Sequence, residues 1–466
     1  MVSANKKLVN PARIVCHPGK PMRSLTRWLC ACFAVGLVLA GFAAEKPRPN
    51  ILFILADDLG YGDLGCYGAP DIRTPNIDRL AREGVRLTDF YSNGPVCTPT
   101  RCGLMTGRYP QRIGGLEWAI PPGAKHLGLP PQEKTIATLL RESGYATAMA
   151  GKWHLGYTED RAPNAHGFER FFGLLSGNHD YFTHRENNGE RDLFLDTKPV
   201  VLEGYSTHLI TQHALEFLGG MKDKPFFLYV AFNAPHFPLQ GPDDGDKQVT
   251  LKNWAQGTRE TYVKMVEAMD AGVGEILAAL DQRGLAKNTL VVFASDNGGD
   301  RFARNLPLAH GKGTLGEGGI RVPCLARWPG KIPAGKVSHQ VGITMDWSAT
   351  ILKLAGAQPP KDRPLDGKDL LPILAGERWG VKRTLFWRRV GPNWVETHRA
   401  VRDGNWKLIE DANGKQSLYD LAKDITEANN LAEKEKSKAA RMKKLLDQWE
   451  GQIHPPLYQV SRKPEN

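Results

Sequence analysis

The chain has 466 residues, is 41% hydrophobic and carries a formal net charge of +11. This length accommodates one large domain and a smaller one, and the ordinary hydrophobic content excludes large-scale disorder. Basic residues do not cluster with aromatic residues, so nucleic acid is not an expected partner. The mild positive balance suits an anionic substrate, although proteins with neutral substrates often share it.

The first predicted element is a signal peptide over residues 1–44. Six basic residues and no acidic residue precede the apolar run 28–40, so removing them lowers the net charge from +11 to +5. The run is short for a membrane span of about 20 residues, and small residues follow it, which favours cleavage near Ala43 or Ala44. An uncleaved anchor is the alternative, and a start at Met22 would shorten the leader. We expect an exported protein, periplasmic or secreted, without stable membrane insertion after cleavage.

Cleavage would leave four cysteines, namely Cys66, Cys97, Cys102 and Cys324. If Cys97 is chemically modified, three cysteines remain, which is an odd number. Export permits disulfides, but this number does not indicate a disulfide framework. A single Cys66–Cys102 bridge stays an open alternative.

Residues 45–376 are predicted to form an α/β domain. Helical patterns cover residues 260–280, with apolar positions on one face, and residues 134–142, which Gly144 ends. They alternate with apolar runs, so we expect a large, mostly parallel sheet flanked by helices. Three of these runs have the composition of strands covered on both faces, at 51–56, 225–232 and 290–294.

Residues 377–466 show a different pattern. Turn signals at 403–404 and 413–414 punctuate the segment, and a charged helix is predicted from Ala432 to about Trp449. We expect a smaller α+β domain on an antiparallel sheet. Its short strand-like segments lie at 384–387, 399–402 and 406–409.

Polar side chains follow each of the three apolar runs. Asp57 and Asp58 follow the first, His236 the second, and Asp296 and Asn297 the third. Because the carboxyl ends of parallel strands form the ligand crevice of an α/β sheet, we expect these groups to converge. Three carboxylates and an amide oxygen suit one Ca²⁺ per chain, with Mg²⁺ the less suitable ion. Ordinary strand-end turns are the alternative, since Asp and Asn are common in them.

The most distinctive motif is Cys97-Thr98-Pro99-Thr100-Arg101. On its own it is equally compatible with a turn that holds a buried thiol. Two further segments add cationic groups, Lys152 and His154 within residues 151–156 and Lys312 in a glycine-rich loop. A lysine is a compact charge that suits a tetrahedral anion, and a solvated surface position is the alternative for each.

Taken in order, these motifs resemble those of the type I sulfatases, the arylsulfatase and N-acetylgalactosamine-6-sulfatase-like enzymes of the alkaline phosphatase superfamily. Segments 400–408 and 418–421 are similar to that family's C-terminal domain. The resemblance implies an alkaline phosphatase-like fold and hydrolysis of sulfuric esters. The segments that carry it are 50–60, 97–101, 151–156, 233–238, 295–299 and 312–323.

The resemblance also implies the chemistry of Cys97. A formylglycine-generating enzyme would oxidise this residue to formylglycine (3-oxoalanine), whose hydrated aldehyde is the nucleophile of the family. A Ca²⁺ ion would be bound by Asp57, Asp58, Asp296 and Asn297, with an oxygen of the modified Cys97 completing its ligands.

Roles for the remaining groups follow from the same resemblance. Arg101 would hold the formylglycine side chain and support the metal ligands, and Lys152 and Lys312 would bind the sulfate oxygens. His154 would lie beside the formylglycine hydroxyls and remove a proton when sulfate is expelled. His236 would protonate the leaving oxygen.

The substrate class is less closely defined by sequence. Sulfated carbohydrates are the expected substrates, and a sulfated small molecule is also compatible with the motifs. Residues 177–185 have the polar and aromatic mix of a sugar site, with an ordinary surface loop as the alternative, and residues 391–398 are candidates to reach over the pocket. The rival functions are a phosphate or phosphonate monoester hydrolase of the same superfamily and a non-catalytic sulfated-glycan binding protein.

Overall fold

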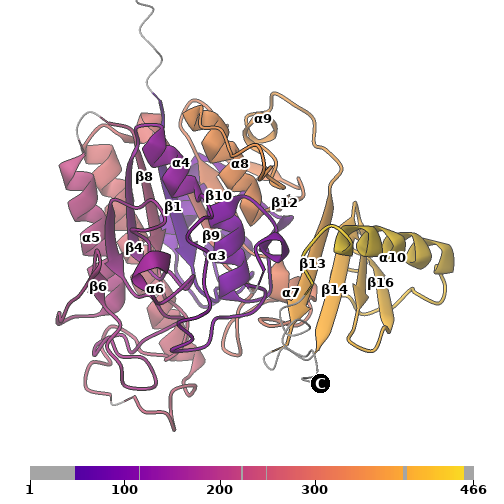
Figure 1. Ribbon diagram of the computed structural model, residues 1–466, viewed down its shortest axis with the longest axis horizontal. Helices are drawn as coiled ribbons and strands as arrows, with labels where there is room; N and C mark the ends of the chain where they lie inside the picture. Colours follow the sequence, from indigo (N-terminus) through magenta and orange to yellow (C-terminus); the bar gives the residue numbers. More distant parts are fainter. Residues whose placement is uncertain (1–47, 115, 222–223, 248, 392–395, 456–466) are drawn as a thin grey trace, which may run out of the picture. The chain divides into compact units, whose positions relative to one another are not determined.

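A computed structural model describes residues 48–455, except for 115, 222–223, 248 and 392–395 (Figure 1). The predicted signal peptide and residues 392–395 of the segment 391–398 lie outside the described residues. Within the described part of the chain, no helix is both long enough and apolar enough to cross a membrane. Residues from Arg48 onward belong to one compact unit, and the boundary at 376–377 stays a prediction.

The large sheet has ten strands in the order β11-β2-β10-β9-β1-β8-β4-β5-β6-β7. Its five central strands are parallel, whereas β10 runs antiparallel to β9 and β6 antiparallel to β5. The sheet is therefore mixed with a parallel centre, which confirms the predicted fold class. The central strands are β9 (Thr289–Ser295), β1 (Asn50–Ala56), β8 (Phe226–Ala231), β4 (Ala146–Gly151) and β5 (Arg170–Gly173). The outer strands are β10 (Cys324–Arg327), β2 (Val85–Leu87), β11 (Lys336–Ser338), β6 (Phe194–Leu195) and β7 (Lys198–Pro199).

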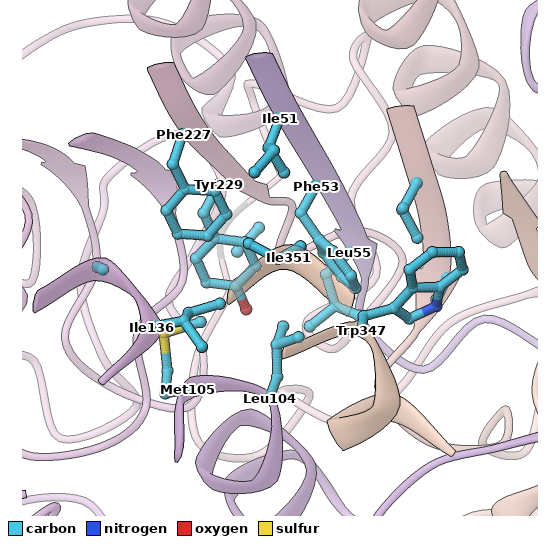
Figure 2. Packing of buried hydrophobic residues seen from close by; sticks show 14 of the residues in the cluster. Ile51, Phe53, Leu55, Leu104, Met105, Ile136, Phe227, Tyr229, Trp347 and Ile351 are labelled. Atoms are coloured by element: carbon cyan, nitrogen blue, oxygen red, sulfur yellow. The ribbon is translucent and has the colours of Figure 1, made fainter. Parts of the chain in front are cut away.

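Helices cover both faces of the sheet. Successive side chains of β1 point to opposite sides, and all of them are buried, so both faces need a covering layer. Ile51, Phe53 and Leu55 face α3 (Cys97–Thr106), α4 (Ile136–Glu142) and α8 (Thr344–Ala355), a packing that Figure 2 shows. Leu52 and Ile54 face α2 (Pro75–Glu83), α5 (Ser206–Gly220) and α6 (Arg259–Gln282). Each such fully buried side chain contributes about 1.5–3 kcal/mol of transfer free energy. The predicted apolar runs are thus strands, and the predicted helix 260–280 is α6.

The C-terminal segment forms a separate four-stranded antiparallel sheet, in the order β13-β14-β15-β16. Gly404 and Gly414 occupy left-handed conformations in two of its turns, as the predicted turn signals require. The last helix, α10, packs on β14 and β15 through Ala439, Met442 and Leu446. The bounds are β13 (Thr384–Val390), β14 (Thr397–Asp403), β15 (Trp406–Glu410), β16 (Gln416–Asp420) and α10 (Lys436–Glu450).

One prediction in this framework is wrong, and one open alternative is excluded. The last helix begins at Lys436 and not at Ala432, because the side chain of Asn430 accepts hydrogen bonds from the backbone of Leu418 and Ala432 and holds the chain in a turn. The Cys66–Cys102 bridge is not formed, since all four described cysteines are free. Cys66 packs on one face of the sheet and Cys102 on the other, so the two thiols cannot meet.

Short elements complete the described fold. β3 (Phe90–Tyr91) and β12 (Gly342–Ile343) pair as a two-stranded parallel sheet, and the short helices α7 (Glu317–Ile320) and α9 (Leu371–Leu374) lie in connecting segments. Single 3₁₀ turns occur at Gly65–Tyr67, Pro110–Arg112, Glu159–Arg161 and Ala286–Asn288.

Candidate active site

Polar side chains converge at the carboxyl edge of the large sheet. Asp57 and Asp58 follow β1, His236 follows β8, and Asp296 and Asn297 follow β9. These three strands are adjacent and parallel, so their ends lie at the same edge. The predicted convergence of these side chains is confirmed.

The start of α3 and the end of β4 bring the remaining predicted residues to this edge. Cys97 is the first residue of α3 and Arg101 lies one turn later, while Lys152 and His154 follow β4 and Lys312 lies in the loop before α7. The Sγ of Cys97 and carboxylate oxygens of Asp57 and Asp296 lie within 4.8 Å of one another. Hydrogen bonds connect the other predicted residues to this group.

Each of the three carboxylates has a cationic partner. Lys152 Nζ donates to Asp57 Oδ2 at 2.5 Å, and Lys312 Nζ donates to Asp58 Oδ2 at 2.6 Å. Arg101 donates to Asp296 Oδ2 through its Nε at 3.1 Å and a terminal nitrogen at 2.8 Å. All three acids are almost fully buried, so each ion pair offsets a large desolvation cost.

Burial and the repulsion between neighbouring carboxylates raise the pKa of two of these three acids. Burial, followed by the neighbouring Asp57, raises the pKa of Asp296 to about 6. Burial likewise raises the pKa of Asp57, although Lys152 and Arg101 oppose this. Burial also acts to raise the pKa of Asp58, but the charge of Lys312 outweighs it and holds that pKa below its usual range.

Two buried oxygens of the cluster have no hydrogen-bond partner among the described residues, Asp57 Oδ1 and Asn297 Oδ1. The amide of Asn297 is fixed, because its Nδ2 donates to Asp58 Oδ1 at 2.7 Å. An unpaired buried oxygen costs about 1–3 kcal/mol, so two of them beside three carboxylates need an explanation. Hard oxygen ligands of this kind fit a divalent cation such as Ca²⁺.

His154 lies directly beside Cys97. Its Nε2 is 3.0 Å from the carbonyl oxygen of Ile120, which can only accept, so this nitrogen carries the proton. The unprotonated Nδ1 then faces Cys97 Sγ at 3.1 Å. Burial, followed by the charge of Lys152, lowers the pKa of His154 to about 3, which keeps the ring neutral. The arrangement presents a lone pair to whatever group occupies position 97.

His236 forms a pair with Lys312. Its Nδ1 donates to the carbonyl of Phe237 at 2.9 Å, which leaves Nε2 to accept from Lys312 Nζ at 3.0 Å. Burial, followed by the positive charge of Lys312, lowers the pKa of His236 to about 3. The mobile proton of this pair therefore resides on Lys312, whereas the sequence prediction assigned the donor role to His236.

Arg101 hydrogen-bonds to two segments that carry residues of the site. Besides its bonds to Asp296, it donates to the carbonyl oxygen of Lys152 at 2.7 Å. It thus connects α3 with β9 and with the end of β4. The side chain makes no described hydrogen bond to Cys97, so its proposed grip on a modified residue 97 stays a prediction.

Several contacts have no counterpart in the sequence predictions. Thr98 Oγ1 donates to the carbonyl of His154 at 3.1 Å and accepts from the backbone of Ile120 at 3.2 Å. The side-chain nitrogen of Asn178 lies 3.3 Å from His236 Nδ1, and the Tyr181 hydroxyl lies 3.0 Å from the carbonyl of His236. Asn178 and Tyr181 belong to the segment singled out as a sugar site. The polar and aromatic composition of that segment was the one signal for them.

That segment, residues 177–185, is not an ordinary surface loop. His179, Asp180, Tyr181 and His184 are buried. Gly177 lies so close to His154 that a Cβ at this position would be 2.7 Å from the ring carbon Cε1. The segment therefore packs against both histidines of the site.

A buried cysteine ringed by carboxylates, lysines and histidines, at the carboxyl edge of an α/β sheet, defines a hydrolytic site for a small anionic group. The chain belongs to the sulfatase family: the family model described as Sulfatase matches residues 49–357. A second model, described as N-sulphoglucosamine sulphohydrolase, C-terminal, matches residues 310–452. The chain is a sulfatase and hydrolyses sulfate esters, as the motifs predicted.

Individual proteins agree with this assignment. The chain is 39% identical to the N-acetylgalactosamine-6-sulfatase of Canis lupus familiaris over 83% of this chain and 76% of the relative. It is 38% identical to human arylsulfatase A over 84% and 85% of the two chains. The solved structure of Ps i-CgsB in complex with k-i-k-neocarrahexaose is 35% identical, with a TM-score of 0.79 over 86% of this chain and 92% of that one.

Proposed function

We propose that the protein removes sulfate from a sulfated carbohydrate, with formylglycine at position 97 and Ca²⁺ in the acidic cluster. The carrying observation is the unprotonated Nδ1 of His154, which faces Cys97 Sγ at 3.1 Å inside a ring of charged groups. The carbohydrate part rests on relatives named for N-acetylgalactosamine 6-sulfate and on the neocarrahexaose complex of a similar structure.

Asp57, Asp58, Asp296 and Asn297 would hold the ion. The two unpartnered oxygens, Asp57 Oδ1 and Asn297 Oδ1, support this assignment. A cation on these oxygens would also release Lys152 and Lys312 from their carboxylates, so that both ammonium groups become available to sulfate oxygens. When bound, Ca²⁺ supplies Lewis-acid polarisation and neutralises developing negative charge.

Residue 97 and its neighbours divide the remaining chemistry. A formylglycine at this position supplies a hydrated aldehyde, with one hydroxyl for attack on sulfur and a second for the release of sulfate. His154 Nδ1 would take the proton of a hydroxyl at position 97, and its distance of 3.1 Å from Cys97 Sγ supports this role. Lys152 and Lys312 stabilise charge on the sulfate oxygens. The Lys312–His236 pair, joined at 3.0 Å, would supply the proton that the leaving oxygen needs.

Two further proposals concern the route to the active enzyme. Conversion of Cys97 requires a formylglycine-generating enzyme as a partner during maturation. The basic and apolar order of residues 1–44 supports export to the periplasm or the medium.

The test combines mass spectrometry with a substrate screen. Protein made with a formylglycine-generating enzyme should show loss of sulfur at Cys97 and release sulfate from defined sulfated mono- or oligosaccharides. Cys97→Ala should abolish turnover, whereas Cys102→Ala, on the same buried helix, should retain it. An intact Cys97 thiol in fully active protein contradicts the modification.

The rival functions give different results in the same screen. Faster hydrolysis of aryl phosphate or phosphonate esters than of aryl sulfate supports the phosphate or phosphonate monoester hydrolase. Glycan binding without turnover, in protein fully converted at residue 97, supports the binding protein.

A further inference from the structure

Trp118 lies at the rim of the site, close to the loop that carries Lys312. Two residues further on, the backbone of Ile120 contacts both Thr98 and His154. The far end of the Trp118 ring lies 3.7 Å from where a Cβ of Gly313 would be, next to Lys312. The indole is only half-buried, so part of it faces solvent within one residue of a sulfate-binding lysine.

Arg389, from β13 of the C-terminal sheet, stacks on this indole with its guanidinium carbon 5.2 Å from the ring centre. No described carboxylate lies within ion-pair distance of Arg389, although the charge of Glu396 acts on it from further away, and its buried Nε has no hydrogen-bond partner among the described residues. The neighbouring Arg388, in contrast, is fully paired. A half-buried arginine without a direct ion-pair partner, close to the Lys312 loop, can bind a further anion.

A rigid pair holds this arrangement in place. Glu117, next to Trp118, accepts two hydrogen bonds of 2.6 Å from Arg388, next to Arg389. Both members are buried, and Arg388 also bonds Glu450. Two neighbouring residues of one segment thus contact two neighbouring residues of another. Glu117 and Arg388 form a buried ion pair, and beside it Arg389 stacks on Trp118. No hydrogen bond or ion pair among the described residues joins Trp118 or Arg389 to the group around Cys97, and the chemistry proposed above uses neither residue.

We propose that Trp118 and Arg389 form a second subsite, which binds the sugar next to the cleaved sulfate. The indole offers an apolar surface for the C–H face of a pyranose ring. The guanidinium fork binds a second anionic group, a sulfate ester or a carboxylate, on that glycan. The substrate class would then be a glycan with at least two anionic groups. This inference rests on the proposed carbohydrate function.

Binding and turnover test it separately. In a Cys97→Ala background, calorimetry would compare N-acetylgalactosamine 6-sulfate with a chondroitin 6-sulfate tetrasaccharide and a carrageenan hexaose. We expect Arg389→Ala to weaken binding of the oligosaccharides about 10-fold or more and to leave the monosaccharide unchanged. The hexaose carries sulfate esters and no carboxylate, so a loss with this ligand identifies the second group as sulfate. A loss confined to the tetrasaccharide, which carries both groups, shows that the carboxylate is required.

Control variants separate the subsite from general damage. Trp118→Ala should weaken oligosaccharide binding, whereas Trp379→Ala, at a 95% exposed tryptophan, should not. Lys438→Ala removes another stacked cation, from Trp406, and should have no effect. Equal weakening of all ligands by Arg389→Ala, or no weakening, overturns the subsite. Failure of the proposed function appears elsewhere, as wild-type enzyme that hydrolyses an aryl sulfate but releases no sulfate from any glycan.

Discussion

At the scale of single residues, the position of the His154 ring depends on the absence of a side chain at Gly177. An added Cβ would lie 2.7 Å from Cε1 and 2.9 Å from Nε2 of the ring. Both distances are shorter than van der Waals contact, so the imidazole would have to move. Its bonds to Ile120 and Cys97 would then be disturbed together.

We therefore expect Gly177→Ala to lower kcat about 10- to 100-fold, because small displacements of a catalytic group have effects of this size. Steady-state kinetics with an aryl sulfate would measure it, with thermal unfolding to confirm the fold. Gly220→Ala is the matched control, since nothing lies within 4 Å of a Cβ there. Wild-type kcat in Gly177→Ala would contradict this dependence.

The site residues that could be predicted from the sequence are the polar residues directly after the buried strands. Asp57, Asp58 and Asp296 follow long apolar runs, and the ends of parallel strands must meet. The Ile120 carbonyl could not be predicted, because every residue carries one and only the tertiary fold selects it. Trp118 and Arg389 are more than 250 positions apart in the chain, so no local pattern pairs them.

At the scale of elements, long segments were predictable and short ones were not. β1, β8, β9 and α6 carry enough apolar positions to show a period. β3 and β12 have two residues each, too few for a pattern, and they form where tertiary packing brings the backbones together.

The loop that carries Lys312 depends on the element after it. The backbone of Glu317, the first residue of α7, donates to a carboxylate oxygen of Glu427, and Lys407 of β15 lies 2.9 Å from both carboxylates. Burial acts to raise the pKa of Glu317, but Lys407 and then Arg321 lower it to about 2, so the group is ionised. A buried cation thus joins the C-terminal sheet to the catalytic loop.

Lys407→Met should lower the free energy of unfolding by about 3–5 kcal/mol, because it leaves two buried carboxylates without their shared cation. Denaturant titration would measure it. Lys423→Met is the matched control: this lysine is 85% exposed, so its pair with Asp420 contributes less than about 1 kcal/mol. Equal stability changes in the two variants would contradict a special role for the buried cation.

At the scale of the whole molecule, the C-terminal sheet supports several segments of the active site. Trp387 Nε1 donates to the carbonyl of Ser92 at 2.8 Å, on the approach to Cys97, and Arg388 pairs with Glu117. Through Lys407 the sheet also holds the segment after Lys312. The change of composition near residue 377 predicted a second sheet. It did not predict that residues of this sheet would form hydrogen bonds and ion pairs with the loops of the active site.

The acidic cluster makes the stability of the whole chain depend on calcium. An ion that binds the folded state alone adds about 2.7 kcal/mol at 100 times its dissociation constant. We expect Ca²⁺ to raise Tm and a chelator to lower it, with a smaller effect of Mg²⁺, as measured by scanning fluorimetry. Asn297→Ala removes one unpartnered oxygen and should reduce the Ca²⁺-induced shift, whatever its own Tm.

Asp300→Asn, three residues further on, should keep the full shift, because its carboxylate lies outside the cluster and accepts from the backbone of Arg301. This measurement needs neither substrate nor formylglycine, so it separates ion binding from catalysis. If Asn297→Ala kept the wild-type Ca²⁺ response, the buried amide oxygen would not be a ligand. The two unpartnered oxygens beside three carboxylates would then need an explanation other than a bound cation.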